Sequence, residues 1–360
     1  MTIAKLEEDN IKLIKEFGAE PISNIKNLPD FYTFNNDLFY SHRDFDKFLS
    51  RLEKGEPSAI VSGFNASGTI HLGHKAVFDT NLYFQKKYGL KVFIPISDDE
   101  SYVSGKVKTQ EEAFEHSLNL VKDLLAYGFD PENTYFIIDQ VYTNIYNYAI
   151  MLSKRIIFSI SRATYGYNDQ SNLGLIFYST IQSAHILFPQ LEFNINNVLV
   201  PIGPDEEVHF RICRDLASKF NLVKPATIHA RFLPGVDGAK MSKSKNNCIF
   251  LRDTEKEIIK KVNKSLSGGR ETSEEHRKLG GIPENDIACY YLEKYFLSNE
   301  ESKKLNNEYR KGNLLSSEIK KKLTQNLLKF VEDFQNNLKF IKTSDCEKVV
   351  LRNKEGKNLF

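Results

Sequence analysis

The chain has 360 residues, of which 41% are hydrophobic and 27% charged, and it carries a net charge of +2. These values are typical of a globular protein and argue against a fibre or a disordered chain, and no uncharged apolar run approaches the roughly 20 residues that span a bilayer. The N-terminus lacks the basic-then-apolar pattern of a secretory signal, so we expect a cytoplasmic protein that does not enter a membrane.

The first predicted elements are an N-terminal extension and a strand–turn–helix–strand unit. The extension covers residues 1–50 and is predicted to be helical around Ile11–Phe17. The unit consists of a strand, a glycine-bearing turn, a helix and a second strand, at Ala59–Val61, Gly63–Gly68, His71–Lys87 and Val92–Ile96. This order predicts a parallel sheet that binds ligands at the carboxyl ends of its strands.

Residues 105–195 are predicted to form a mostly helical insertion in this sheet. Thr109 and Glu112 resemble a capping box, and apolar residues keep helical spacing up to Gly128. The sheet then resumes with a strand, a helix and a short strand, at Val198–Ile202, Glu207–Phe220 and Thr227–Ala230. We therefore expect a Rossmann-type α/β nucleotide-binding domain over residues 51–251.

The last part of the chain, residues 252–360, is predicted to be an all-helical C-terminal domain. One apolar stripe at helical spacing is made by Ile319, Leu323, Leu327, Phe330, Phe334, Leu338 and Ile341. Residues 251–360 hold 23 basic against 18 acidic side chains. This mild excess of positive charge fits a domain that faces RNA, although a solvated helical surface explains it about as well.

The four cysteines are Cys213, Cys248, Cys289 and Cys346. They lie far apart and never form the CxxC spacing of a zinc or redox site. We predict reduced structural thiols and no metal site built from side chains.

The turn after the first strand has the features of a phosphate site. The segment Gly63–His74 contains three glycines and two histidines at the start of a helix. The N–H groups at a helix N-terminus carry partial positive charge, and His71 and His74 share one face of its first turn. Gly73 between them leaves room for an adenine or a ribose. Taken alone, two such histidines are more often surface or core residues.

A second segment, Gly235–Ser244, places two lysines in a loop. Lys240 and Lys243 are preceded by Gly235 and Gly238, which favour a loop that can close. Mobile lysines stabilise the charge that develops on a leaving pyrophosphate. In a chain this rich in lysine, the segment alone would be read as a surface loop.

The pair of motifs, His71-Leu-Gly-His74 and Lys240-Met-Ser-Lys-Ser244, resembles the signature of the class I aminoacyl-tRNA synthetases. The resemblance implies that His71 and His74 hold ATP phosphates, and that Lys240, Ser242 and Lys243 stabilise the transition state of adenylate formation. It further implies ATP contacts from Gly63, Ser67, Gly73, Asp205, Met241, Ser242 and Ser244. Magnesium is expected to arrive on the ATP phosphates rather than in a protein cage.

Further segments resemble the archaeal and eukaryotic tryptophan enzymes of that family. They are Leu38–Asp44, Asp98–Glu100, Ile181–Ala184, Phe188–Gln190, His209–Ala217, Gly268–Arg277 and Gly280–Gly281. The resemblance implies L-tryptophan and tRNA(Trp) as substrates and a homodimer as the assembly. It places Glu100 and Gln182 against the ammonium group of tryptophan, with Glu206 as a further tryptophan contact.

The sequence departs from that family at several places. Glu206 stands where a substrate-facing glutamine is usual, and Ala66 replaces a proline. Val61 and Pro95 replace a tyrosine and a glutamine that help to recognise indole in eukaryotic enzymes, so no residue is assigned to the indole N–H. Three other hypotheses remain open: a tyrosine-specific enzyme, a small-molecule adenylyltransferase such as a pantothenate synthetase, and a non-acylating paralogue that binds RNA.

Overall fold

The computed structural model describes residue 14 and residues 18–241 and 245–353, so the helix predicted around Ile11–Phe17 lies outside the described residues apart from Ile14. The chain divides into two compact units, which we call the first and the second unit. The first unit contains residues 1–41, 70–80 and 230–339, and the second contains residues 42–69, 81–229 and 340–360. This division differs from the boundary predicted near Leu251, because the backbone of residues 70–72 pairs with residues 249–251.

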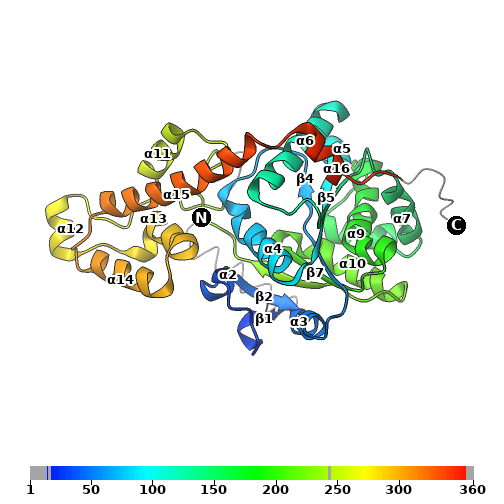
Figure 1. The fold of residues 1–360 in the computed structure, drawn as a ribbon, viewed down its shortest axis with the longest axis horizontal. Helices are drawn as coiled ribbons and strands as arrows, with labels where there is room; N and C mark the ends of the chain where they lie inside the picture. The colour runs from blue at the N-terminus through cyan, green and yellow to red at the C-terminus, as the bar shows by residue number, and fades with distance from the viewer. Residues whose placement is uncertain (1–13, 15–17, 242–244, 354–360) are drawn as a thin grey trace. The chain divides into compact units, whose positions relative to one another are not determined.

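The second unit is built on a parallel sheet (Figure 1). Its strands lie in the order β6-β5-β3-β7-β8, with the bounds β3 Ser58–Val61, β5 Lys91–Ser97, β6 Thr134–Ile138, β7 Asn197–Ile202 and β8 Ala226–Ala230. The short strand β4 (Phe64–Asn65) pairs with β5 beyond the end of β3. Every residue of β3 is buried, as expected for a central strand covered on both faces. The order is that of a Rossmann-type sheet, which confirms the predicted fold class.

Helices cover both faces of this sheet. In Figure 1, α7, α9 and α10 lie together on one side, and the side chains between them and the sheet form a large apolar core. The helices of the unit are α3 Phe45–Glu53, the end of α4 (Lys75–Tyr88), α5 Asp98–Val103, α6 Gln110–Tyr127, α7 Asn144–Ser153, α8 Phe158–Tyr165, α9 Leu173–Phe193, the 3-10 helix η3 Pro204–Glu206, α10 Glu207–Lys219 and α16 Thr343–Val349.

Strand β6 corrects one part of the sequence prediction. Residues 105–195 were expected to be mostly helical, and they are, except that Thr134–Ile138 continue the main sheet beside β5. Val92 is opposite Thr134 in this pair, and the strand is almost wholly buried. A five-residue apolar run has no periodicity that separates a buried strand from part of a helix, so its partner strand decides its structure.

Helix α6 begins and ends where the sequence predicts. The Thr109 hydroxyl accepts a hydrogen bond from the backbone N–H of Glu112 at 3.1 Å. Gly128 follows the last turn with a φ of 115°, a conformation that favours glycine. The Glu112 carboxylate accepts from the backbone of Lys108 at 2.8 Å, so the predicted capping box is made one residue early.

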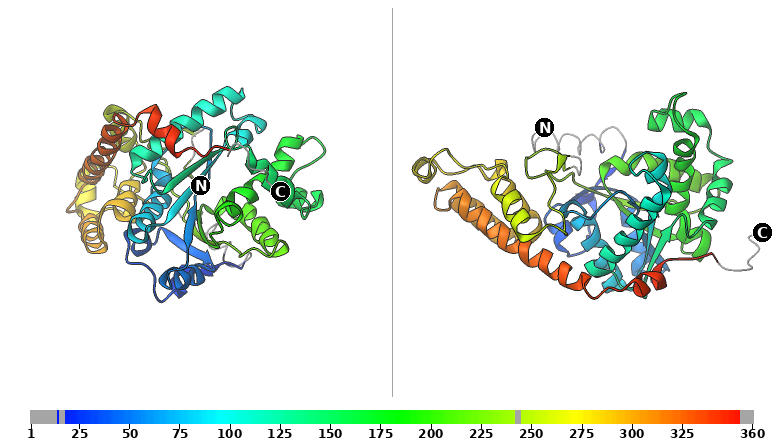
Figure 2. Two further views of the ribbon diagram at one scale, coloured as in Figure 1. Left: turned by 45° about the vertical axis from the view of Figure 1, so that its right-hand side comes forward. Right: turned by 90° about the horizontal axis from the view of Figure 1, so that it is seen from above.

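The first unit is mainly helical after residue 254. Its elements before that point are β1 Glu20–Pro21, η1 Ile22–Asn24, α2 Tyr32–Asn35, the start of β2 (Phe39–Arg43), η2 Leu72–His74 and the start of α4. Those after it are α11 Glu255–Asn263, α12 Ser273–Leu279, η5 Pro283–Asn285, α13 Ile287–Tyr291, the π-helix η6 Leu292–Phe296, α14 Asn299–Arg310 and α15 Ser316–Leu338. In Figure 2, α15 is the long orange helix that runs beside α11 and α13.

The predicted apolar stripe explains how α15 packs. Ile319, Leu323, Leu327 and Phe334 are buried on one face, as the helical spacing requires. α11 and α14 each begin with a capping box, at Thr254 and Ser298. Within the described residues, none of the helices combines the length and the apolarity that crossing a membrane requires.

Candidate functional site

The residues predicted to bind substrates fall into both units. His71, Gly73, His74, Lys240 and Met241 belong to the first unit. The second unit contains Gly63, Ser67, Glu100, Gln182, Asp205 and Glu206. Ser242, Lys243 and Ser244 lie outside the described residues.

In the first unit, the two histidines form a compact pair at the start of a helix. The ring centroids of His71 and His74 are 4.0 Å apart. The Nδ1 atom of His71 accepts a hydrogen bond from the backbone N–H of Gly73 at 3.1 Å, so in the neutral ring the proton sits on Nε2. This arrangement holds the His71 ring in place and makes its Nε2 atom a hydrogen-bond donor.

Backbone pairing brings the two sequence motifs together. The N–H of Leu72 donates to the carbonyl of Ile249 at 2.9 Å, and the N–H of Leu251 donates to the carbonyl of Ile70 at 3.1 Å. His71 thereby forms an antiparallel bridge with Phe250, a few residues after the lysine motif. Segments that lie more than 160 residues apart in the chain thus form one local structure.

Gly73 lies between the two motifs. A Cβ atom on Gly73 would lie 2.8 Å from Nδ1 of His71 and 3.0 Å from Sδ of Met241. The role predicted for Gly73, to leave room for an adenine or a ribose, stays a prediction, and the His71 ring and the Met241 side chain are neighbours that the sequence did not identify. A larger residue at this position would therefore have to displace the His71 ring or the Met241 side chain.

The segment before the lysine motif forms a tight turn. The N–H of Gly235 donates to the carbonyl of Ala239 at 2.6 Å, and Gly238 has a φ of 79°. The Asn247 amide donates to the Asp237 carboxylate at 2.8 Å and to the carbonyl of Lys240 at 3.2 Å. The Lys240 ammonium lies 3.9 Å from the centroid of the Phe232 ring. These contacts fix the backbone of the turn on both sides, as far along the chain as Met241.

In the second unit, Glu100 lies in α5, directly after β5. Its carboxylate accepts hydrogen bonds from the amide of Asn65 and from the Lys106 ammonium, the latter at 3.0 Å. The Glu100 side chain is 13% exposed. Glu100 is therefore largely buried, and Asn65 and Lys106 are partners that the sequence did not identify.

Gln182 carries an unused acceptor. Its Nε2 atom donates to the Glu206 carboxylate at 3.1 Å. Its Oε1 atom is buried and has no hydrogen-bond partner among the described residues. The structure thus joins two of the residues that were predicted to contact tryptophan, and it leaves one buried oxygen ready to accept an N–H donor.

Two residues near this pair were given no role from the sequence. The rings of Tyr165 and His209 are 4.7 Å apart, and within the described part of the chain both the Tyr165 hydroxyl and Nδ1 of His209 are buried without a partner. Burial lowers the pKa of His209 to about 4, so the ring is neutral at physiological pH. His209 begins one of the segments that resemble the tryptophan enzymes, and Tyr165 lies in no motif, but only packing shows that the polar atoms of both lack partners among the described residues.

Asp98 and Asp99, the two residues before Glu100, form a group of largely buried carboxyl groups with Asp139. Asp98, Asp99 and Asp139 have oxygen atoms within 4.8 Å of one another, and Nε2 of His185 lies 2.7 Å from Asp139. Burial, reinforced by Asp139, raises the pKa of Asp99 to about 8, and burial lowers the pKa of His185 to about 4. Protons therefore remain on part of this group at neutral pH. Asp98 also accepts the backbone N–H of Asp139 at 3.0 Å, which gives the group a structural role.

The other predicted ATP contacts lie at the ends of strands. Gly63 follows β3, and a Cβ atom there would meet only the carbonyl oxygen of Pro95 at 3.9 Å. The N–H of Ser67 donates to the carbonyl of Asn65 at 2.8 Å. Asp205 lies in η3, directly after β7, and its carboxylate folds back over Gly203. Ends of parallel strands are where ligands bind in such sheets.

Comparison with known proteins adds independent information. The sequence profile of the family described as "tRNA synthetases class I (W and Y)" matches residues 53–332. The chain is 35% identical over 347 residues to the tryptophan–tRNA ligase of Thermococcus onnurineus, covering 92% of this chain and 88% of that protein. It is 33% identical over 368 residues to the cytoplasmic tryptophan–tRNA ligase of Saccharomyces cerevisiae, covering 96% of this chain and 85% of that protein.

The fold agrees with these matches. The crystal structure of tryptophanyl-tRNA synthetase from the archaeon Aeropyrum pernix K1 is similar with a TM-score of 0.88 and 30% identity. The similarity covers 96% of this chain and 97% of that chain.

Proposed function

Because the chain belongs to the class I tRNA synthetases of the tryptophan and tyrosine family, we propose specific roles for its residues in the reaction of a tryptophan–tRNA ligase. The enzyme is a ligase that activates tryptophan with ATP and transfers it to tRNA. Similarity to tryptophan enzymes over nearly the whole chain carries the assignment and favours tryptophan over tyrosine. The roles of single residues below are our proposals.

His71 and His74 bind ATP phosphates at the N-terminus of the helix that η2 and α4 make. The helix N-terminus supplies partial positive charge, and the Nε2 proton of His71 supplies a hydrogen-bond donor. The supporting observation is that Nδ1 of His71 already accepts from the Gly73 backbone, which fixes the tautomer. Gly63, Ser67, Gly73, Asp205, Met241, Ser242 and Ser244 complete the proposed set of ATP contacts.

Lys240 and Lys243 act on the transition state. In the activation step, the carboxylate of tryptophan attacks the α-phosphorus of ATP, the bond to the β-phosphate oxygen breaks, and pyrophosphate leaves with the electron pair. The lysine ammonium groups and the Ser242 hydroxyl stabilise the charge that grows on the leaving group. No enzyme nucleophile takes part, because the substrate itself attacks.

Magnesium is proposed to enter with ATP. The ion prefers oxygen ligands, whereas the side chains assigned to the phosphates are mainly histidines and lysines. This donor set does not fit a protein cage for Mg²⁺, so the ion is assigned to the phosphate oxygens and to no residue of the chain.

The ammonium group of tryptophan is bound by Glu100 and Gln182. The Gln182 Oε1 atom is a buried acceptor without a partner among the described residues, and an ammonium group is a donor only. The Glu100 carboxylate adds charge, and Lys106 and Asn65 hold it in position. Glu206, which accepts from Gln182, orients the amide so that its oxygen faces the substrate.

Tyr165 and His209 are proposed to receive the indole N–H. Val61 and Pro95 have no side-chain acceptor for this hydrogen bond, and the indole N–H can only donate. The neutral His209 ring offers Nδ1, and the Tyr165 hydroxyl offers an oxygen, and both atoms are buried without partners within the described residues. Tyr165→Phe and His209→Phe should each raise the KM for tryptophan in pyrophosphate exchange and leave the KM for ATP unchanged, and an unaltered tryptophan KM in both would contradict this role.

The tRNA is proposed to bind the helical residues 252–360, which carry the excess of basic side chains. A homodimer is proposed to form through α7, α8 and the start of α9, which carry the exposed apolar side chains of Ile150, Met151, Ile157, Phe158, Ile160 and Leu173.

The cytoplasm is the proposed location, in line with the yeast relative.

ATP–pyrophosphate exchange with each standard amino acid supplied separately tests the function. Exchange should depend on tryptophan, and charging should be confined to tRNA(Trp). Exchange with tyrosine at equal or higher kcat/KM would overturn the substrate assignment. Because the chain has 17 tyrosines and no tryptophan, binding is also measurable through the fluorescence of the ligand's own indole.

A further inference from the structure

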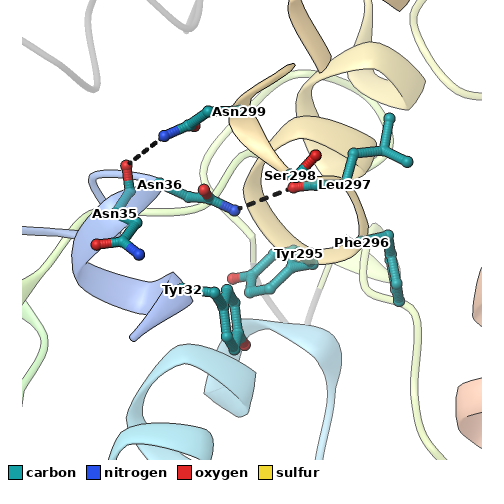
Figure 3. A pocket seen from close by; sticks show the side chains of 8 residues that line it. All are labelled: Tyr32, Asn35, Asn36, Tyr295, Phe296, Leu297, Ser298 and Asn299. Atoms are coloured by element: carbon teal, nitrogen blue, oxygen red, sulfur yellow. Dashed lines mark hydrogen bonds between the residues drawn. The ribbon is translucent and has the colours of Figure 1, made fainter. Parts of the chain in front are cut away.

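The first unit contains a cavity of about 360 Å³ that is lined by none of the residues assigned to the reaction. Its lining residues come from α2 and the residue after it, and from the segment that joins η6 to α14 (Figure 3): Tyr32, Asn35, Asn36, Tyr295, Phe296, Leu297, Ser298 and Asn299. The volume lies at the lower end of the range for sites that bind small molecules, so it suits one or two rings rather than a whole nucleotide.

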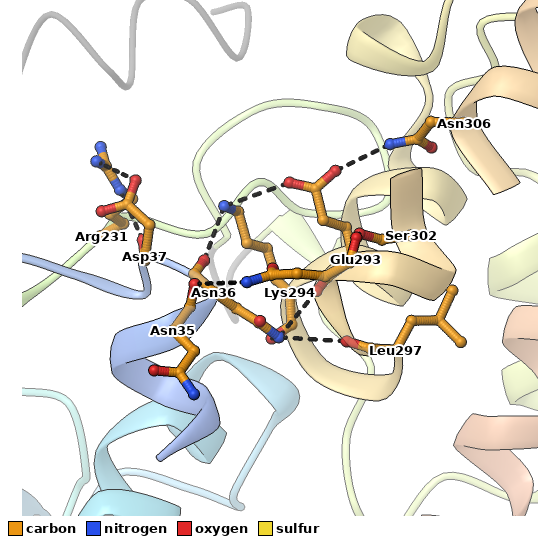
Figure 4. Close-up of polar contacts among 10 residues, drawn as sticks. Asn35, Asn36, Asp37, Arg231, Glu293, Lys294, Leu297, Ser302 and Asn306 are labelled. Atoms are coloured by element: carbon orange, nitrogen blue, oxygen red, sulfur yellow. Dashed lines mark hydrogen bonds and ion pairs between the residues drawn. The ribbon is translucent and has the colours of Figure 1, made fainter. Parts of the chain in front are cut away.

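The walls of the cavity are held together by reciprocal hydrogen bonds (Figure 4). The Asn36 amide donates to the backbone carbonyls of Glu293 and Lys294 at 3.0 and 3.2 Å, and the Lys294 ammonium donates back to the carbonyl of Asn36 at 2.9 Å. The Asn299 amide donates to the carbonyl of Asn35 at 3.4 Å. These contacts join segments more than 250 residues apart in the chain, so the cavity is preformed rather than a gap between loose loops.

The Tyr295 side chain supplies independent support for a ligand in this cavity. Its side chain is only 7% exposed, and its hydroxyl is buried without a hydrogen-bond partner among the described residues. Figure 3 shows this hydroxyl pointing toward the side of the cavity that Tyr32 forms. Burial raises the pKa of Tyr295 well above its usual value, so the group keeps its proton at neutral pH and can donate.

The position of Tyr295 also depends on an uncommon backbone feature. It lies in the π-helix η6, a conformation that is rare and is found often at functional sites. A buried hydroxyl that gives up water without gaining a partner is unfavourable, so its retention needs a reason.

The chemistry of the walls indicates the kind of ligand. All eight lining residues are uncharged, which disfavours an ion. Tyr32, Tyr295 and Phe296 offer aromatic surface beside the polar side chains of Asn35, Asn36 and Asn299, of which Asn36 and Asn299 also hold the walls together. We propose that this cavity binds an uncharged heteroaromatic molecule of nucleobase size, whose ring lies against the tyrosines and whose acceptor atom receives the hydrogen bond of the Tyr295 hydroxyl.

The proposed site is linked to the histidine turn within the same unit. The Tyr32 hydroxyl donates to the Asp79 carboxylate at 2.5 Å, and the Lys75 ammonium lies 2.6 Å from the same carboxylate. Lys75 directly follows His74 in the chain. A ring bound against Tyr32 therefore contacts a residue that is hydrogen-bonded to the helix that begins at the ATP motif.

The test measures binding of adenine, cytosine and nicotinamide, each supplied separately, to the full-length protein in saturating ATP, so that the nucleotide site is filled. Equilibrium dialysis or saturation-transfer NMR should show one saturable site for at least one of these probes. Tyr295→Phe keeps the ring and removes only the hydroxyl, so it should weaken that binding about fivefold to tenfold, the effect of losing one neutral hydrogen bond.

A matched variant separates this role from a general effect on folding. Tyr309 is also buried in the same unit, but its hydroxyl donates to Asp286 at 2.9 Å and lies 2.7 Å from the Ser316 hydroxyl. Tyr309→Phe should lower the Tm and leave probe binding unchanged, whereas Tyr295→Phe should leave the Tm unchanged or raise it. The proposal is overturned if none of the three probes binds saturably, or if Tyr295→Phe binds them as tightly as the wild type.

Discussion

The Sδ atom of Met241 lies 3.0 Å from the position that a Cβ atom on Gly73 would occupy. These residues belong to the two motifs proposed to bind ATP, so a single methyl group added at Gly73 would press on both motifs. The effect of this contact on the reaction can therefore be measured by adding one methyl group at Gly73.

Gly73→Ala should therefore disturb the phosphate site rather than the fold. The added Cβ atom would meet Nδ1 of His71 at 2.8 Å, so the ring or the Met241 side chain must move. A displacement of that size at a reacting centre lowers kcat by on the order of 10²-fold. Pyrophosphate exchange measures the effect. Adding Met241→Ala should restore part of the rate if the sulfur contact contributes, and wild-type kcat in Gly73→Ala would contradict the packing argument.

Lys240→Ala should lower kcat much more than it raises the KM for ATP. Deleting one preorganised donor to charge that develops in the transition state typically costs about 10²- to 10³-fold in rate. Stopped-flow measurement of adenylate formation before tRNA is added isolates this step. Lys245→Ala removes a neighbouring exposed lysine and should be without effect. A raised KM with an unchanged kcat would mean that Lys240 binds ATP equally in the ground state.

Gln182→Ala should weaken tryptophan activation and spare ATP. The variant removes the buried Oε1 acceptor proposed for the ammonium group, and the loss of a partner of a charged group costs about 2–5 kcal/mol. The KM for tryptophan should rise by at least about 30-fold in exchange assays. Gln190→Ala is the matched control on the same helix. The Gln190 amide binds the backbone of Val223 at 2.8 and 2.9 Å, so its removal should lower the Tm and leave the tryptophan KM unchanged.

Glu100→Gln should raise the KM for tryptophan while keeping the fold of α5. The substitution keeps the size of the side chain but removes the charge that faces the ammonium group, and it weakens the contact with Lys106. Removing charge from such a hydrogen bond costs roughly half its strength. The ratio of the tryptophan KM to the ATP KM is the measurement. If the KM values for tryptophan and for ATP changed by the same factor, Glu100 would have only a structural role.

The buried carboxyl group of Asp99 should make stability fall between about pH 6.5 and pH 8. Its pKa is raised to about 8, so the folded state keeps a proton that the unfolded state has lost, and stability decreases as pH rises toward 8. His185, with its pKa lowered to about 4, has the opposite effect, because its unfolded form binds a proton below about 6.5. The two effects oppose each other between about pH 4 and 6.5, and above that range the raised pKa of Asp99, together with that of Asp139, makes stability fall.

Urea denaturation at pH 6.5 and 8 measures this difference. The free energy of unfolding of the wild type should drop by about 1–2 kcal/mol between the two values. In Asp99→Asn, which has no carboxyl proton to lose at this position, that drop should be clearly smaller, with the remainder coming from Asp139, whose pKa burial also raises well above its usual value. If the free energy of unfolding of Asp99→Asn fell by the same amount as that of the wild type, the pH dependence would come from another group.

Local patterns in the sequence were sufficient to predict the elements whose first and last residues are set by nearby residues. Helix α6 begins at the Thr109 cap and ends at Gly128, because both capping interactions lie within a few residues of the helix. Strand β6 shows the limit of such reasoning. Its apolar run fits a helix or a strand, and only the partner strand β5 selects between them.

The sequence by itself determined the fold class and the family and identified the two motifs for which we propose a role in ATP binding, because periodicity, caps and motif spacing are properties of neighbouring residues. The tertiary structure alone decided that Met241 packs on Gly73 and that Asn36 binds the carbonyls of Glu293 and Lys294. It also decided that the Gln182 Oε1 atom and the Tyr295 hydroxyl are buried without partners among the described residues. Burial and the loss of a hydrogen-bond partner depend on which distant segments pack together, and no spacing within the chain encodes that directly.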